Sequence, residues 1–164
     1  MTPEAIRARA MPLDLRSPAF ERGAFLPERF TLDGANVPPP LAWSGAPAQT
    51  RSFALVVEDL DTPQRPFVHW LAWNIDGEAR ALAEGVASGA PGLVQGTNDY
   101  GRLGWGGPCP PRGKGAHRYR FRILALDILL DLPAGAGREK LEGHIHGHAL
   151  AVGELSAKYA WRDR

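Results

Sequence analysis

The chain has 164 residues, about the length of one domain, of which 44% are hydrophobic and 23% are charged. Lys and Arg number 19 and Asp and Glu number 18, so the net charge of +1 is too small to hold nucleic acid through its backbone alone. The 19 glycines and 15 prolines exclude a helical bundle, because both residues destabilise helix interiors. We expect one domain over 1–164, with an N-terminal segment 1–19 and a mostly β core over about 20–160.

The single cysteine, Cys109, cannot form a disulfide within the chain. The first 12 residues contain charges and prolines where a secretory signal would have an uninterrupted apolar stretch. We therefore expect a cytoplasmic location and no membrane span.

Several segments carry the alternation or the β-branched and aromatic content of strands. The expected strands are 52–59, 67–75, 117–127 and 149–156. Residues 137–146 predict a helix, and a second, weaker helical pattern covers 6–10 or 79–84. Because the repeated helices of a parallel sheet are missing, this pattern predicts a two-sheet antiparallel β-sandwich with one or two short peripheral helices.

Alternate residues of a strand lie on the same face. In segment 117–127 one face carries His117, Tyr119, Phe121 and Ile123, and the other carries Arg118, Arg120 and Arg122. We expect the arginines to be solvated and the histidine and tyrosine to form the polar rim of a pocket.

The same alternation in segment 67–75 predicts that Phe67, His69, Leu71 and Trp73 share one face. A single histidine on an apolar face is more often a core residue with a satisfied hydrogen bond than a ligand-binding group. Two such histidines, each next to a loop rich in proline and glycine, favour a binding site.

Asp59 and Asp61 follow the strand 52–59 and precede a proline turn. Their simplest role is to begin that turn, since Asp accepts hydrogen bonds from nearby backbone. The alternative is that one or both carboxylates hold a histidine ring, which fixes its tautomer and favours its charged form.

Segment 96–119 contains a loop rich in glycine and proline, over about 101–115, and leads into the strand predicted from 117. Glycines allow successive backbone N–H groups to face an anion, and prolines make the loop rigid. The loop matches neither the phosphate-binding P-loop nor the dinucleotide-binding fingerprint.

Four ordered motifs together resemble one family. They are Asp59-Leu-Asp-Thr-Pro63, His69-Trp-Leu-Ala-Trp-Asn74, Gly107-Pro-Cys-Pro-Pro111 and His117-Arg-Tyr119. They resemble the bacterial branch of the phosphatidylethanolamine-binding protein family, also called Raf kinase inhibitor-like proteins. The resemblance covers about residues 20–159.

The resemblance implies a two-sheet β fold with a small preformed pocket for phosphate, phosphoryl headgroups or carboxylates, and it implies neither an enzyme nor a cofactor. The ligand-binding residues that it implies are Asp59, Asp61, His69, Gly107, Pro108, Cys109, Pro111, His117 and Tyr119. The common family form has proline between the two acids, where this chain has Leu60. That difference frees one backbone N–H group and softens the turn.

A carboxylate repels an anion, so Asp59 can assist only by stabilising an imidazolium, which then donates to the anion together with Tyr119. Binding should therefore strengthen in acid. Three or four such bonds, less the cost of immobilising the ligand, predict an affinity on the order of millimolar to micromolar.

Three alternatives remain open. Cys109 and His117 could form a nucleophilic pair in a hydrolase, although nothing in the sequence indicates an oxyanion hole. His144, His146 and His148 could bind a metal; alternatively, His144 and His146 are exposed near the C-terminus of the helix and His148 is a packing residue at the start of the final strand. The same pocket could bind a phosphorylated protein partner, and the five tryptophans could contribute to a homodimer surface.

Overall fold

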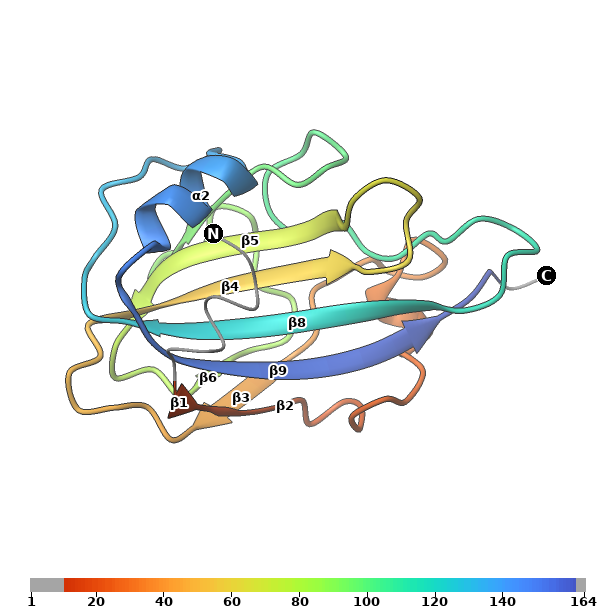
Figure 1. Ribbon diagram of the computed structural model, residues 1–164. Helices are drawn as coiled ribbons and strands as arrows, with labels where there is room; N and C mark the ends of the chain where they lie inside the picture. Colours follow the sequence, from red (N-terminus) through yellow and green to blue (C-terminus); the bar gives the residue numbers. More distant parts are fainter. Residues whose placement is uncertain (1–10, 162–164) are drawn as a thin grey trace.

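The computed structural model describes residues 11–161. Its elements in chain order are β1 (Met11–Pro12), β2 (Asp14–Arg16), the 3-10 helix η1 (Glu28–Phe30), β3 (Leu41–Ser44), β4 (Ser52–Asp59), β5 (Phe67–Asp76), β6 (Ala81–Leu82), β7 (Val94–Gln95), β8 (His117–Leu126), α2 (Arg138–Ile145) and β9 (Ala149–Tyr159). Figure 1 shows the long strands side by side, with α2 lying over one face of their sheet.

The strands form two sheets. A six-stranded sheet has the order β1-β9-β8-β4-β5-β7, and a three-stranded sheet has the order β2-β3-β6. All pairs are antiparallel except β1 with β9, which are parallel. This arrangement confirms the predicted two-sheet, mostly β fold.

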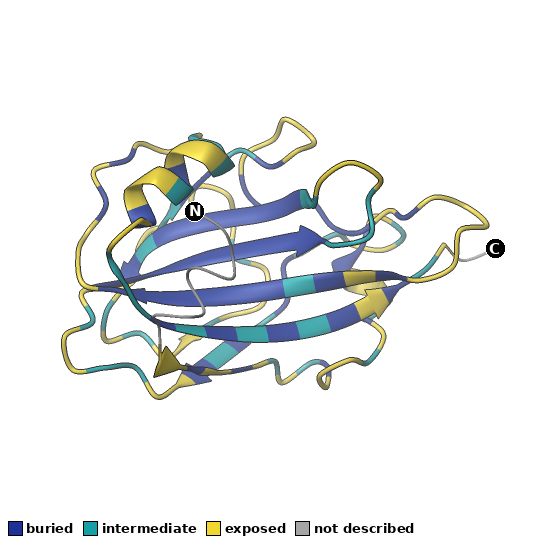
Figure 2. Cartoon of the chain, viewed as in Figure 1, coloured by how far each residue is buried: buried dark blue, intermediate teal, exposed yellow. Residues whose placement is uncertain are grey.

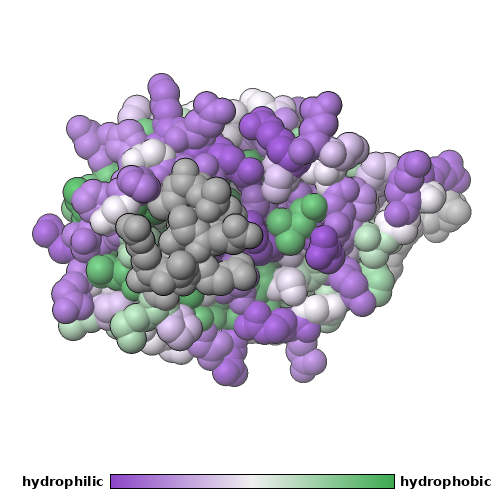
Figure 3. Space-filling view, viewed as in Figure 1, coloured by the Kyte–Doolittle hydropathy of each residue, from purple (hydrophilic) through white to green (hydrophobic). Residues whose placement is uncertain are grey.

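The large sheet buries both of its faces. One face packs against the small sheet, in a cluster that includes Phe53, Trp70 and Phe121. The other face packs beneath α2, where Leu71 and Trp73 meet Leu141 of the helix. The central strands β4, β5 and β8 are therefore almost wholly buried, as Figure 2 shows, whereas β9 alternates between buried and partly exposed residues. Outside the grey region, the face drawn in Figure 3 is mostly hydrophilic.

The predicted alternation of β8 is correct, but the expectation of solvated arginines is wrong for two of the three. Arg118 is exposed, whereas Arg120 is half-buried and Arg122 is 3% exposed. Both lie on the helix-covered face, next to the carboxylate of Glu58. A buried cation requires such a partner, because its desolvation would otherwise cost several kcal/mol (about 3 or more).

A β-bulge changes the predicted alternation of β5. Val57 pairs with Trp70 and Glu58 pairs with Val68, so His69 is an extra residue without a register partner in β4. A bulge reorients the residues on either side of it. His69 consequently faces Tyr119 at a ring separation of 5.4 Å, while Leu71 and Trp73 pack under the helix. The expected common face for Phe67, His69, Leu71 and Trp73 is therefore wrong.

The helix expected at 137–146 is confirmed as α2, within a residue at each end. Residues 79–84 form no helix but contain the short strand β6. The alternative helix at 6–10 lies outside the described residues. Among the described residues, no helix is long and apolar enough to cross a membrane.

Candidate functional site

Asp59 and His117 form a buried pair at one end of the large sheet. Asp59 is the last residue of β4 and His117 is the first of β8, and the two strands are antiparallel neighbours. Nδ1 of His117 lies 2.6 Å from Oδ2 of Asp59, and the residues are 7% and 4% exposed. The other carboxylate oxygen accepts the backbone N–H of Asp61 at 2.8 Å. Both oxygens of Asp59 are thus engaged, and Nε2 is the ring nitrogen of His117 left for another partner.

His69 is held by the glycine-rich loop. Its Nδ1 lies 2.6 Å from the carbonyl oxygen of Gly106, and the Gly106 backbone N–H donates to the carbonyl of His69 at 2.9 Å. The residue is 3% exposed. Burial lowers the pKa of His69, although the Gly106 carbonyl and the Asp59 charge oppose this effect. The contact with a carbonyl requires Nδ1 to carry a proton, so the neutral ring has its lone pair on Nε2.

Tyr119 is close to both histidines, because its ring faces His69 and it lies two residues after His117 in β8. It is 1% exposed, and its hydroxyl has no hydrogen-bond partner of normal geometry among the described residues. Burial, followed by the nearby Asp59 charge, raises the pKa of Tyr119. The phenol therefore remains a protonated donor. The Asp59 carboxylate lies near its hydroxyl but does not form a hydrogen bond of normal geometry with it, so this buried donor is incompletely satisfied. We call Asp59, His69, His117 and Tyr119 the two-histidine site.

Tyr100 and Phe67 border this site, and the sequence reasoning did not single them out. Their rings contact each other and His69, with centroid separations of 4.9 to 5.7 Å. The Tyr100 hydroxyl donates to the Gly107 carbonyl at 2.8 Å. Tyr100 lies in the glycine-rich segment that the sequence singled out. A loop has no regular alternation, however, that would indicate which of its side chains face the site.

Residues 106–108 of the glycine-rich loop, which we call the loop wall, pack tightly against the chain behind them. A Cβ on Gly107 would collide with the Phe30 carbonyl oxygen, and one on Gly106 would lie 2.5 Å from the Tyr100 ring. The Gly107 N–H donates to Oδ1 of Asn36 at 2.8 Å, and the Pro108 carbonyl accepts the N–H of Leu32 at 3.1 Å. Glycine is thus required here by close approach, and the wall is held in place without ligand.

The remaining predicted residues lie outside the two-histidine site. Asp61 does not face the histidines, because its carboxylate accepts the backbone N–H of Arg118 at 2.7 Å and also binds that arginine's guanidinium. The N–H group of Leu60, freed by the absence of proline, donates to the Arg118 carbonyl at 2.9 Å. Leu60 thereby extends the β4–β8 ladder beyond Asp59.

In the loop itself, Pro108 is buried in the loop wall, whereas Cys109 and Pro111 are exposed. No hydrogen bond joins Cys109 to His117 within residues 11–161. A surface hollow of about 480 Å³ lies beside Phe67 and Asp99, adjoining the site on the side of the 62–66 turn.

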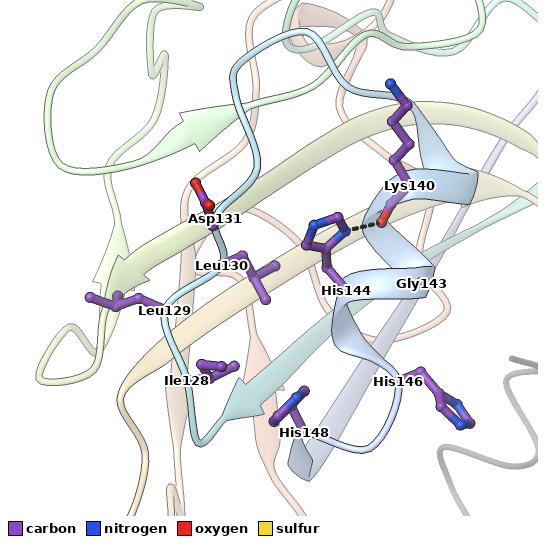
Figure 4. A pocket seen from close by; sticks show the side chains of 9 residues that line it. All are labelled: Ile128, Leu129, Leu130, Asp131, Lys140, Gly143, His144, His146 and His148. Carbon is purple, nitrogen blue, oxygen red and sulfur yellow. Dashed lines mark hydrogen bonds between the residues drawn. The ribbon is translucent and has the colours of Figure 1, made fainter.

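The three histidines near the helix do not gather as metal ligands. Nδ1 of His144 lies 2.8 Å from the carbonyl oxygen of Lys140, and Nδ1 of His148 lies 2.8 Å from Oδ1 of Asp127. Figure 4 shows the ring of His146 directed away from the other two, and all three histidines border a groove next to residues 128–131. Within the described part of the chain, no group of three His, Cys, Asp or Glu side chains could hold a metal ion.

A buried ion cluster occupies the opposite face of the sheet. Its members are Glu58, Arg120, Arg122 and Arg138, and the three guanidinium groups all contact the Glu58 carboxylate. Burial alone would raise the pKa of Glu58, but the neighbouring charges, Arg122 foremost, together with the hydrogen bond from Arg120, hold it below its usual value. Because Arg138 begins α2, this cluster ties the helix to the sheet.

Comparison with known proteins agrees with the fold. A family model described as "Phosphatidylethanolamine-binding protein" matches residues 16–160. The chain therefore belongs to the phosphatidylethanolamine-binding protein family.

Relatives cover most of the chain. A protein from Methanothermobacter thermautotrophicus named UPF0098 protein is 43% identical over 148 residues, which span 86% of this chain and 97% of the relative. A putative lipoprotein, LppC, from Mycobacterium tuberculosis is 43% identical over 127 residues, covering 77% of this chain and 62% of LppC. The lipoprotein name belongs to that relative, and the cytoplasmic location of this chain stays a prediction.

Two solved structures share the fold. A putative phosphatidylethanolamine-binding protein homologue from Chlamydia trachomatis superposes with a TM-score of 0.85 at 34% identity, covering 93% of this chain and 100% of the other. YbcL from E. coli, described as a new member of the mammalian family, has a TM-score of 0.85 at 28% identity, covering 92% and 99%.

Proposed function

We propose that this chain is a non-enzymatic binding protein for small anions, above all phosphate-bearing ones, and that the two-histidine site recognises the anionic group. The observation that carries the proposal is the buried Tyr119 hydroxyl, a donor without a hydrogen-bond partner of normal geometry among the described residues. Buried donors in folded proteins nearly always have an acceptor, from the protein, water or a bound ion. An anionic oxygen would supply one.

The histidines supply the charge in this proposal. Asp59 engages Nδ1 of His117 and thereby leaves Nε2 of that ring for the anion. His69 is neutral at neutral pH because burial lowers its pKa, so an anion at its Nε2 must bind together with a proton. Hydrogen bonds between charged groups are roughly twice as strong as neutral ones, which favours the doubly protonated site once the anion is present.

The size of the site limits the ligand to a headgroup or a free ion. His69, His117 and Tyr119 are each 7% exposed or less, so little of the site is open to a larger molecule. Recognition therefore concerns a phosphoryl or carboxylate group and little beyond it. We expect dissociation constants on the order of micromolar to millimolar.

Isothermal titration calorimetry with inorganic phosphate, phosphoethanolamine and ethanolamine tests the proposal. We expect both phosphates to bind with similar affinity and ethanolamine not to bind, because the phosphoryl group supplies the contacts. Binding of ethanolamine alone, or no binding of either phosphate up to about 10 mM, would refute the proposal.

A phosphorylated protein partner would use the same contacts. A pull-down of phosphorylated proteins with and without competing phosphate tests that extension.

The rival hydrolase hypothesis requires a reactive Cys109, so its thiol should then be labelled unusually fast at low pH. Ordinary labelling rates across pH would argue against a nucleophilic pair.

A further inference from the structure

A cavity is lined in part by Tyr100 and Gly106, two residues that also contact His69 of the two-histidine site. It has a volume of about 700 Å³ and is bounded by the loops 32–38, 85–88 and 100–106. This volume is typical of pockets for small organic molecules. We call it the Arg102 pocket. We propose that the Arg102 pocket binds small amphipathic anions, that is, molecules with an apolar body and a single carboxylate or sulfonate.

Apolar side chains that remain in contact with solvent form part of the walls of this pocket, beside polar groups. The apolar residues that matter here are Leu32, Val37, Val86, Leu103 and Trp105. Leu32 is 44% exposed and Leu103 is 41% exposed. Covering apolar surface of this kind is favourable by about 25 cal/mol per Å², so the walls favour a ligand with an apolar body.

The lining of this pocket includes one charged residue, Arg102. Arg102 is exposed, and of the residues that line the pocket it alone is charged at neutral pH. Its guanidinium has no ion pair or hydrogen bond with the residues that the structure describes. Glu84, which precedes the lining residue Gly85 in the chain, is paired with Arg29 at 2.7 Å. The free cation therefore selects an anionic group on the ligand.

Hydrogen bonds hold the Arg102 side of the pocket in shape without a ligand. Oδ1 of Asn98 accepts the backbone N–H groups of Tyr100 and Arg102, at 2.9 and 3.2 Å. The amide Nδ2 of Asn98 donates to the Gly104 carbonyl at 2.8 Å. Asn98 is itself 3% exposed, so this loop is held by a side chain in the protein interior.

The other two walls are joined to each other and to the sheet. The Gly85 N–H donates to the Pro38 carbonyl at 2.9 Å, linking two loops. The buried side chain of Gln95 in β7 donates to the Ala87 carbonyl at 2.7 Å and accepts from the Trp70 indole at 2.8 Å. A pocket formed in advance does not lose affinity to loop ordering when a ligand binds.

Fluorescence titration with the dye 8-anilinonaphthalene-1-sulfonate tests the proposal, because the dye has an aromatic body and one sulfonate. The uncharged dye N-phenyl-1-naphthylamine has nearly the same body and serves as the comparison. The variants are Arg102→Gln and Arg51→Gln. Arg51 is a suitable control because it is also exposed and has no ion pair within residues 11–161, yet it does not line the pocket.

We expect saturable binding of one sulfonated dye per chain, displaced by octanoate at lower concentration than by octanol. Arg102→Gln should weaken dye binding about threefold to fivefold, as expected for a solvent-exposed charge pair, and should not change binding of the uncharged dye. Arg51→Gln should bind like the wild type. Equal effects of the two substitutions, no saturation, or equal displacement by octanoate and octanol would overturn the proposal. Near-ultraviolet circular dichroism establishes that each variant is folded.

Discussion

The imidazole Nδ1 of His117 and Oδ2 of Asp59 are 2.6 Å apart in a setting where both residues are less than one-tenth exposed. This contact joins the end of one strand to the beginning of a strand 58 residues later in the chain. It directs the second ring nitrogen of His117 away from the carboxylate. This contact fixes the orientation of the His117 ring within the two-histidine site.

Replacing Asp59 with Asn should weaken phosphate binding about tenfold, because the amide removes the carboxylate that accepts from Nδ1 of His117 and orients that ring. Asp61→Asn is the matched comparison. Asp61 binds the exposed Arg118 instead of a histidine, so we expect less than a twofold change in affinity. Calorimetric titration of both variants measures the difference, and an equal loss in the two would show that Asp61 belongs to the site.

Tyr119→Phe should also weaken phosphate binding about tenfold, since one hydrogen bond to a charged group is lost. The same substitution should not reduce the stability of the fold. The hydroxyl has no partner of normal geometry among the described residues, so removing it should leave the free energy of unfolding unchanged or raise it by up to about 1 kcal/mol.

Tyr159→Phe is the control for that substitution. The Tyr159 hydroxyl donates to Asp33 at 2.7 Å, and its loss should reduce stability by about 1 kcal/mol while phosphate affinity is retained. Urea unfolding and calorimetry together separate the two patterns. A stability loss for Tyr119→Phe as large as that for Tyr159→Phe would mean that the Tyr119 hydroxyl has a partner after all.

Anion affinity should increase as the pH falls from 8 to 5. Burial lowers the pKa of His69 below its usual value of 6.5, so the free protein protonates this ring less readily and a bound anion draws a proton onto it. Sulfate is the informative ligand, because its own charge does not change over this range. Titrations in buffers of different ionisation enthalpy should reveal proton uptake, and His69→Gln should reduce it. A sulfate affinity that is constant with pH would exclude protonation of the site.

The lowered pKa of His69 also makes the stability of the free protein depend on pH. The unfolded chain takes up a proton on His69 near pH 6.5, whereas the folded chain resists it. His69 therefore lowers stability progressively as the pH falls below about 6.5. Sulfate should restore part of that loss, which thermal unfolding at pH 5.5 with and without sulfate can measure.

Glu58→Gln should destabilise the fold by about 3 kcal/mol, because three arginines would lose their shared counter-charge. In the wild type the pKa of Glu58 is lowered from 4.5, so its contribution is complete above that pH and is lost as the pH falls through the folded value. Urea unfolding between pH 3 and 7 measures both effects. The exposed Glu78→Gln serves as the control, with an expected change within about 0.5 kcal/mol.

Gly107→Ala should displace the loop wall, because the added Cβ would collide with the Phe30 backbone and with Oδ1 of Asn36. We expect a stability loss of about 1–3 kcal/mol and a weakened phosphate affinity. Gly143→Ala in α2 meets no atom within 4 Å and should instead stabilise the chain by up to about 1 kcal/mol. Equal stabilities of the two variants would contradict the tight fit of the wall.

Local patterns in the sequence were sufficient for several parts of this structure. The alternation of β8 placed His117 and Tyr119 on one face, and the apolar run of β4 ended correctly at Asp59. The short helix before the last strand was also predicted, because helix and strand periodicity depend only on neighbouring residues. The motifs around these elements identified the family that the family model then confirmed.

Other features depend on partners far along the chain. The bulge that turns His69 toward Tyr119 arises from the register between β4 and β5, which the β5 sequence does not specify. Arg122 appeared solvated in the sequence because its partners, Glu58 and the start of α2, become neighbours only when β4, β8 and the helix pack together.

The sequence by itself determined the mostly β character of this protein, the positions of its long strands and the residue types available for an anion site. Only the tertiary structure decided that Asp59 and not Asp61 holds His117, that Tyr100 borders the site, and that Tyr119 is a buried donor without a normal partner among the described residues. The physical reason is that periodicity reports which face of its own strand a residue occupies. Hydrogen-bond partners and desolvation depend on strand register and on packing between distant segments.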